Sequence, residues 1–435
     1  MKTEGHLLRV LGVGFGLAVI IGNTIGAGIF RAPGSIAAQI PNAGPFLLIW
    51  LAGAVYALLG AISIAELGTM IPRSGGQYVF SRYALGEYAG FIVGWSDWIS
   101  SCGSTAAVAL VVGTFSEALV PAVAGKGPGI AAAVTILFAV LQWRGIVWGS
   151  TIQNLTSLLK ALAFLALIIA AFALGGSGAL TSSQTNSTSA ITISAVVLSL
   201  QAVIYTYDGW AGVIYFSEEV KHPARDIPRA LFGGVLSIAA IYLLVNVALL
   251  YVLPVSGMAG KEFAAGEAAN VIFGVYGDTI FRCLTIVSML SGINALHLMA
   301  TRVIFAMSRD GLFTKKAAAV NEGGTPSVSL FLSALVAVLF IILGQRFDVV
   351  ITVLAFFFVA NYILSFISLF VLRRREPEKP RPYRAWGYPF TPALALLGSV
   401  VFLGGAIYAD QRNSVYALLL LAVSYPVFLL MKEVK

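Results

Sequence analysis

The segment Gly22-Asn23-Thr24-Ile25-Gly26-Ala27-Gly28 interrupts the first long apolar run of the chain, which covers residues 10–38. Three glycines and two polar residues stand where a membrane-spanning helix would carry apolar side chains. Irregular backbone inside a membrane occurs only where it lines a cavity or is buried in protein, because an unpaired backbone group is costly in lipid. This segment therefore predicts a helix that breaks beside a cavity.

A second interruption, Tyr205–Gly212 (YTYDGWAG), has the same character in the sixth apolar run, where it places Asp208 and two glycines. Because it lies five runs after the first, the two broken helices would cross the membrane in opposite directions. Paired interruptions at matching places in two halves of a chain indicate a transporter's binding site. We therefore predict one transport domain over residues 1–435, built as inverted five-helix repeats at 9–176 and 190–374 with two appended helices in 385–435.

The composition excludes a soluble protein. Only 11% of the 435 residues are charged, 59% are hydrophobic and the mean hydropathy is +0.91, whereas a soluble domain has about 25% charged residues. A membrane-spanning helix needs about 20 apolar residues. The predicted fold class is all-α integral membrane protein, with twelve transmembrane helices near residues 10–38, 44–70, 88–120, 128–143, 150–175, 191–216, 228–254, 277–306, 327–344, 348–372, 388–409 and 414–431.

The basic residues predict the orientation, since cytoplasmic loops carry an excess of Lys and Arg. With a cytoplasmic N-terminus, twenty Lys and Arg residues fall on the inner side and five on the outer side. The net charge of +8 thus reflects topology and does not predict a nucleic-acid partner. We expect a multi-pass protein of the cell (inner or plasma) membrane with both termini in the cytoplasm.

The chain offers little for catalysis or cofactors. It has no G-x-S-x-G, H-E-x-x-H or Walker motif, and only two cysteines, Cys102 and Cys283, both inside predicted helices. We therefore expect no enzyme activity, no cofactor and no metal site. A channel is disfavoured because it needs a repeated filter or a charged ring.

The two breaks predict a specific ligand chemistry. The half-helix that starts near Gly28 directs free N–H groups and the positive end of its dipole into the membrane, which suits a carboxylate. Unwound carbonyl groups at Asn23–Ile25 and Tyr205–Asp208 suit an ammonium group. Together they match a zwitterionic α-amino acid. A polyamine or a cationic amino acid, with Asp208 binding the second ammonium, remains an alternative.

Three segments resemble motifs of the amino acid–polyamine–organocation (APC) superfamily, most closely its L-amino acid transporter (LAT) type. They are GNTIGAGIF (Gly22–Phe30), Ala65–Trp95 and Tyr205–Leu231, in that order along the chain. The resemblance implies a LeuT-like fold with discontinuous helices 1 and 6 and transport by alternating access. It implies substrate binding at Thr24, Ile25, Gly26, Ala27, Gly28, Tyr205, Asp208 and Gly209, with Tyr205 as the aromatic gate.

Charged residues inside predicted helices are expected to be functional. Lys160, at the position of the family's helix 5 lysine, would either carry a proton or act as a fixed charge between helices 1 and 8. Asp97 lies at a similar depth, so it is a candidate partner of Lys160 and, under proton symport, a second candidate proton carrier. The alternative is that Asp97 caps a local hydroxyl group or lines the cytoplasmic path. Further candidates for the pocket lining are Ser100, Cys102, Ser104, Ser291 and Asn294.

Three other intramembrane groups are expected to be structural. Glu66 is predicted to pair with Arg73, and Asp278 with Arg282, four residues later on the same helix face. His297 has no second ligand at metal-binding spacing and is predicted to be a hydrogen-bonded packing residue.

Coupling and partners follow from the resemblance. In sodium-coupled relatives of this fold a sodium ion takes the place of the Lys160 ammonium, so we expect sodium-independent exchange of small or large neutral L-amino acids. Proton symport remains open. Animal members bond a heavy chain through a cysteine between helices 3 and 4, and the segment Glu117–Pro128 has none. We therefore expect no disulfide-linked heavy chain.

Overall fold

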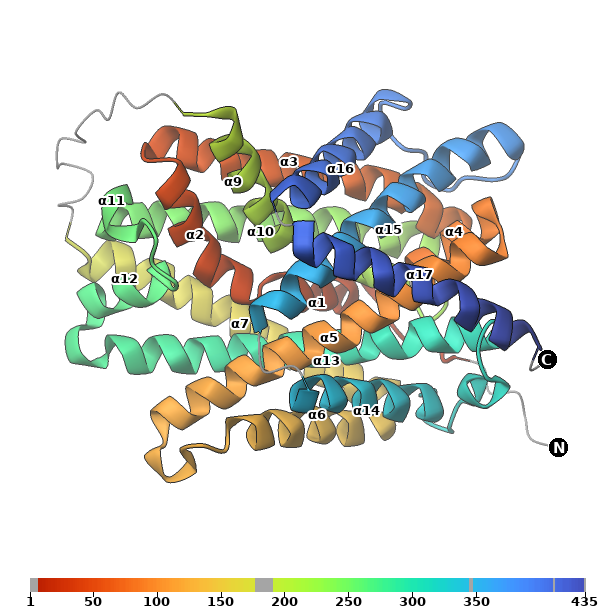
Figure 1. Ribbon diagram of the computed structural model, residues 1–435, viewed down its shortest axis with the longest axis horizontal. Helices are drawn as coiled ribbons and strands as arrows, with labels where there is room; N and C mark the ends of the chain where they lie inside the picture. Colours follow the sequence, from red (N-terminus) through yellow and green to blue (C-terminus); the bar gives the residue numbers. More distant parts are fainter. Residues whose placement is uncertain (1–6, 177–190, 344–346, 410, 434–435) are drawn as a thin grey trace.

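The computed structural model describes residues 7–176, 191–343, 347–409 and 411–433. Within them the longer helices are α1 (Val13–Thr24), α2 (Ala27–Gln39), α3 (Ala43–Met70), α4 (Gln77–Leu85), α5 (Glu87–Leu119), α6 (Gly127–Trp143), α7 (Ile146–Leu174), α9 (Ile193–Tyr207), α10 (Pro223–Val252), α12 (Ala264–Phe273), α13 (Gly277–Arg309), α14 (Ser327–Leu343), α15 (Phe347–Arg375), α16 (Phe390–Ala409) and α17 (Gln411–Glu433). Short helices are η1 (Pro121–Val123), η2 (Gly212–Phe216), α11 (Val255–Met258), η3 (Gly274–Tyr276) and η4 (Lys315–Ala318). Figure 1 shows a helical bundle with both chain ends at one end and α11 and α12 at the other.

The predicted membrane class is confirmed. Eight helical segments of the described chain are long and apolar enough to cross a membrane, and α1 with α2, bent by 46°, makes a ninth when the pair is counted as one span. The shorter apolar helices α6 and α14 lie on two further predicted runs. On α7 the buried face carries Gln153, Ser157 and Lys160 while Leu158 and Leu165 are exposed, so its polar side faces the protein and its apolar side is available to lipid.

Both predicted breaks are present. The first helix stops at Thr24, Ile25 is extended (ψ 93°), and α2 restarts at Ala27 behind Gly26. At the second break, helix α9 stops at Tyr207. Gly209 has a φ of +105°, a left-handed conformation that favours glycine. The chain then continues as the short helix η2.

The end of the bundle that holds the chain termini, here called the terminal end, contains a buried ion pair. Arg302 donates from Nε and Nη2 to the two carboxylate oxygens of Glu219, at 3.0 Å each, and its guanidinium lies 5.0 Å from the Phe216 ring centre. Both charged side chains are at most 1% exposed. The backbone of Leu11 exchanges hydrogen bonds with Glu219 and Lys221 at 2.9 and 2.8 Å. The described residues just before α1 are thereby bonded to the segment that follows η2.

One predicted ion pair is wrong and one is confirmed. Glu66 is fully buried on α3 and pairs with Arg373 (2.6 Å) and Arg381 (3.0 Å), so it faces α15 and the loop that follows. Arg73 lies beyond the end of α3 and pairs instead with Asp310 at 2.9 Å. The α13 pair forms as predicted, with 2.7 Å between Arg282 and Asp278.

Candidate functional site

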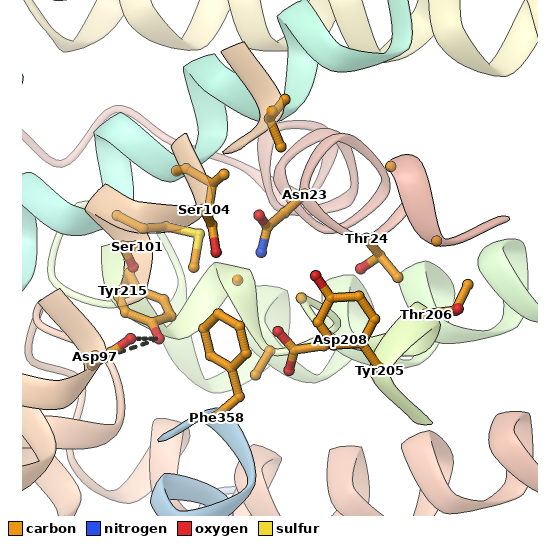
Figure 2. A pocket seen from close by; sticks show the side chains of 18 of the residues that line it. Asn23, Thr24, Asp97, Ser101, Ser104, Tyr205, Thr206, Asp208, Tyr215 and Phe358 are labelled. Atoms are coloured by element: carbon orange, nitrogen blue, oxygen red, sulfur yellow. Dashed lines mark hydrogen bonds between the residues drawn. The ribbon is translucent and has the colours of Figure 1, made fainter. Parts of the chain in front are cut away.

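A cavity of about 90 Å³ lies where the two broken helices meet. Its walls come from the breaks, from α5, and from α13 and α15 (Figure 2). The lining residues are Asn23, Thr24, Gly26, Ala27, Gly28, Gln77, Asp97, Ser101, Ser104, Val108, Tyr205, Thr206, Asp208, Gly209, Ala211, Gly212, Tyr215, Leu296, Met299, Phe358 and Tyr362.

The two breaks touch each other because glycines allow it. A Cβ atom on Gly209 would lie 2.7 Å from Asn23 Nδ2 and 2.9 Å from Thr24 Oγ1, and a Cβ on Gly28 would lie 2.8 Å from Thr206 Oγ1. Tyr242 of α10 joins them, since its hydroxyl donates to the carbonyl oxygens of Thr24 (2.8 Å) and Thr206 (3.0 Å). The unwound segments therefore form one structural unit.

One end of the cavity is suited to an anion. The first turn of α2 has N–H groups without acceptors inside the helix, and the positive end of its dipole lies there. Thr24 is 4% exposed and its hydroxyl has no hydrogen-bond partner among the described residues. A Cβ on Gly26 would meet only the Thr24 carbonyl oxygen, at 4.0 Å, so this face of the break is open. An unpaired hydroxyl beside free N–H groups in an open space suits a ligand with hydrogen-bonding oxygen atoms.

A carboxylate stands next to this end. Asp208 lines the cavity beside Tyr205 and accepts a 2.9 Å hydrogen bond from the hydroxyl of Tyr362 on α15 (Figure 2). Among the described residues it has no salt-bridge partner. The cavity thus combines an anion-binding helix end with an uncompensated acidic group, which suits a ligand that carries both charges.

Most of the predicted binding residues line this cavity. They are Thr24, Gly26, Ala27, Gly28, Tyr205, Asp208 and Gly209, together with Asp97 and Ser104. Ile25 is fully buried outside the lining, and its carbonyl oxygen accepts hydrogen bonds from Lys160 (2.5 Å) and Ser288 (3.1 Å).

Four polar candidates lie elsewhere. On α5 the lining residues Asp97, Ser101, Ser104 and Val108 recur with the helical period, which turns Cys102 to another face. Ser100 is fully buried beside this face and is not a lining residue, and its hydroxyl donates to the Asp97 carbonyl oxygen at 3.0 Å. Ser101 was missed, although its spacing from Asp97 and Ser104 was a readable signal.

The remaining two candidates hold helices together. Asn294 of α13 donates to Gln153 of α7 at 2.8 Å and accepts from Gln142 of α6 at 2.8 Å. Ser291 lies 3.0 Å from the Ser157 hydroxyl. These bonds connect α6, α7 and α13 away from the cavity.

Lys160 and Asp97 are not partners. The Lys160 ammonium donates to the carbonyl oxygens of Gly22 (2.8 Å) and Ile25 (2.5 Å). Asp97 instead accepts the Tyr215 hydroxyl at 2.9 Å to each oxygen. Lys160 lies on the buried face of α7 that packs on α1 and therefore does not point toward Asp97 on α5. Similar depth in the membrane was not enough to bring the two charges together.

Other features were not predictable from the sequence alone. Phe358, Tyr362 and Gln77 line the cavity from segments without a break or an intramembrane charge, and Tyr215 lines it from η2, just after the second break. His297 is 1% exposed, but neither ring nitrogen has a hydrogen bond among the described residues, so the prediction of a hydrogen-bonded histidine is wrong within them. The described residues contain no group of three His, Cys, Asp or Glu placed to hold a metal ion.

Comparison with known proteins connects this geometry to a family. The amino acid permease family model matches residues 16–429. The chain is 30% identical to the serine/threonine exchanger SteT of Bacillus subtilis over the full length of both. It is 28% identical to the mouse b(0,+)-type amino acid transporter 1, covering 94% of this chain and 85% of that protein. It is 26% identical to the human large neutral amino acids transporter small subunit 2, covering 87% and 72%.

Proposed function

Because this chain belongs to the amino acid permease family of the APC superfamily, a family of membrane transporters and not of enzymes, we propose that it exchanges neutral L-amino acids by alternating access without sodium. One observation carries the proposal. The buried Thr24 hydroxyl, which has no partner among the described residues, lies beside the free N–H end of α2 in a cavity that Asp208 also lines. A substrate carboxylate at α2 and an ammonium group at Asp208 and the nearby carbonyl groups would pair both ends.

The site residues receive roles on the same basis. Gly26, Ala27 and Gly28 present backbone N–H groups to the substrate carboxylate, and Thr24 donates its hydroxyl. Tyr205 stands beside Asp208 (Figure 2), where its ring acts as the gate over the bound substrate. Asp208 and Gly209 form the opposite wall.

The proposed architecture is twelve transmembrane helices with inverted repeats at 9–176 and 190–374, followed by two helices in 385–435. Support comes from the two breaks, which lie in contact through Gly28 and Gly209 and are both tied to Tyr242. Broken helices that meet at one cavity are typical of transporters built from such repeats.

Sodium independence is supported by Lys160. Its ammonium group already binds the carbonyl oxygens of Gly22 and Ile25, so these acceptors of the first break hold a fixed charge. Lys160 is thus proposed as a structural cation that keeps helix 1 unwound. A sodium ion at the same carbonyl groups would be repelled.

We further propose a cell-membrane location with both termini in the cytoplasm, and no disulfide-linked heavy chain. The segment 117–128 has no cysteine, and of the two cysteines Cys102 is buried. The human and rodent relatives of the large neutral type carry "small subunit" in their names. Purification of the chain as an active protein without a partner would test this point.

The first experiment measures radiolabelled serine uptake into proteoliposomes, with serine, another neutral amino acid or no amino acid inside. We expect uptake only into preloaded vesicles, unchanged when sodium is replaced by choline. Uptake into empty vesicles that follows an imposed pH gradient would contradict exchange and establish proton symport. Absence of amino acid transport together with putrescine uptake would contradict the amino acid proposal.

A further inference from the structure

We propose that Asp97 and Tyr215 form a second cation subsite in the cavity, which binds the distal ammonium or guanidinium group of a basic amino acid. This inference rests on the proposed amino acid transport and extends its substrate class. In this proposal Asp97 of α5, which is not part of either break, determines whether the protein accepts substrates with neutral or with basic side chains.

The charge of the cavity is the first argument. Two carboxylates, Asp97 and Asp208, are among its lining residues, and none of the lining residues is Lys, Arg or His. A bound zwitterion has one ammonium group, for which Asp208 and the carbonyl groups at the breaks suffice. Asp97 is then left without a counter-charge, and an unpaired buried carboxylate is unfavourable. A substrate with a second positive group would compensate it.

The second argument is the incomplete coordination of Asp97. Its side chain is 2% exposed, and both carboxylate oxygens accept from a single donor, the Tyr215 hydroxyl, at 2.9 Å. A carboxylate has about four acceptor positions, so others remain for a ligand. Asp97 lines the cavity one helical turn before Ser101 (Figure 2), and that hydroxyl is a second group for a cationic head to contact.

The third argument is that Tyr215 is fixed in place. Its carbonyl oxygen accepts from the Gly75 backbone N–H at 3.1 Å. A Cβ on Gly76, where φ is +67°, would lie 2.4 Å from the tyrosine ring. The ring thus packs directly on the backbone between α3 and α4. Because the hydroxyl is held toward Asp97 by this packing, the pair is preorganised for a ligand.

The position of the pair selects the kind of cation. One cavity is lined both by the free N–H end at Gly26–Gly28 and by Asp97, and in Figure 2 the Phe358 ring lies between Asp97 and Asp208. A basic amino acid supplies a carboxylate for the first site and a cation for the second. A polyamine leaves the anion site empty and is therefore the poorer match.

The test uses two ligands that differ by one group. Proteoliposomes preloaded with serine take up labelled serine while external L-lysine or L-norleucine, which has the same carbon chain without the distal ammonium, competes. We expect lysine to compete in the wild type. The quantity compared is the ratio of the inhibition constant of lysine to that of norleucine. Asp97→Asn should raise this ratio by about tenfold or more, as expected for a lost charged hydrogen bond. Asp278→Asn, at the exposed end of α13, should leave the ratio unchanged.

Two further variants keep the test decisive. Tyr215→Phe should shift the ratio in the same direction, and it replaces Asp97→Asn if that variant fails to fold. Lysine that does not compete with wild-type serine exchange overturns the inference while the proposed function stands. A ratio that changes in Asp208→Asn but not in Asp97→Asn also overturns it. Absence of any amino acid exchange overturns the proposed function itself.

Discussion

At the scale of single residues, Gly26 offers the sharpest test of the anion site. Its φ is −133° and a Cβ there would meet nothing closer than 4.0 Å, so Gly26→Ala should fold normally. The added methyl group would nevertheless occupy the open space in front of the α2 N–H groups. We expect serine exchange in proteoliposomes to fall at least about tenfold, because charged hydrogen bonds to the substrate carboxylate are lost.

Gly14→Ala is the matched control for this change. Gly14 is an exposed residue of α1, and its added Cβ would also find nothing within 4 Å. Both variants should elute as monodisperse protein in size-exclusion chromatography. Wild-type exchange in Gly26→Ala would contradict the placement of the substrate carboxylate at α2.

Residue-level prediction from the sequence succeeded where the signal is local. Glycines and polar residues inside an apolar run mark a break whatever the rest of the fold does, so Thr24, Gly26, Gly28, Asp208 and their neighbours could be named. Side-chain partners could not, because they depend on how helices rotate about their axes. Asp97 and Lys160 have similar predicted depth, yet one binds Tyr215 and the other binds carbonyl groups of helix 1.

At the scale of helices and breaks, Tyr242 of α10 joins the two unwound segments through its hydroxyl group. Tyr242→Phe removes the hydroxyl that donates to Thr24 and Thr206 and leaves the ring packing against Trp50 and Tyr207. We expect a loss of stability of about 1 kcal/mol, in the range measured for hydrogen bonds between membrane helices. Serine exchange should fall as well, because the two breaks no longer move as one unit.

The control for this variant lies on the same helix. Tyr251 of α10 packs on Phe172 with 5.3 Å between ring centres, and its hydroxyl makes no hydrogen bond within the described residues. Tyr251→Phe should therefore leave thermal unfolding and exchange near wild type. Equal effects of the two substitutions would contradict the bridging role of Tyr242.

Helix positions were easier to predict than helix faces. Apolar runs separated by charged or glycine-rich segments predicted where helices lie, since lipid requires long apolar stretches. Periodicity is weak in these helices because both lipid-facing and buried sides are apolar. Cys102 therefore lies on the wrong face of α5, Ser100 lies beside the lining without belonging to it, and the inward-facing Tyr215 and Tyr362 were overlooked.

At the scale of the whole molecule, the two ends of the bundle differ in how their ion pairs are buried. Arg302 and Glu219 at the terminal end are at most 1% exposed, whereas Arg282 and Asp278 near the start of α13 are 27% and 58% exposed. Glu219→Gln should destabilise the protein by about 3–5 kcal/mol, because it leaves a buried arginine without its counter-charge. Asp278→Asn should cost less than about 1 kcal/mol. Thermal unfolding of the purified variants measures both.

A double variant separates charge burial from transport. Glu219→Leu with Arg302→Met replaces the pair by apolar side chains, and such replacement restores most of the stability in other proteins. We expect recovered thermal stability but slower exchange, since the pair ties α13 to the segment that follows η2. Wild-type exchange in the stable double variant would show that the pair has no part in closing the terminal end.

The twelve-helix arrangement can be tested at α14, one of its two short apolar helices. The 17 residues of α14 extend about 26 Å at 1.5 Å per residue, slightly less than a hydrocarbon core of about 30 Å. Lys261, before α12, and Arg384, between α15 and α16, are separated by α12, α13, α14 and α15. With 10 residues, α12 is too short to cross the membrane by itself. If α14 crosses the membrane, three crossings put these residues on opposite sides. If it does not, two crossings put them on the same side.

Cysteine labelling distinguishes the two cases. In a Cys283→Ser background, Lys261→Cys and Arg384→Cys are treated with a membrane-impermeant maleimide on intact cells and after permeabilisation. We expect Lys261→Cys to react in intact cells and Arg384→Cys only after permeabilisation, because Arg384 belongs to the loop richest in positive charge and such loops stay in the cytoplasm. Reaction of both in intact cells would exclude a crossing by α14. The reverse pattern would keep the crossing but place both chain termini outside.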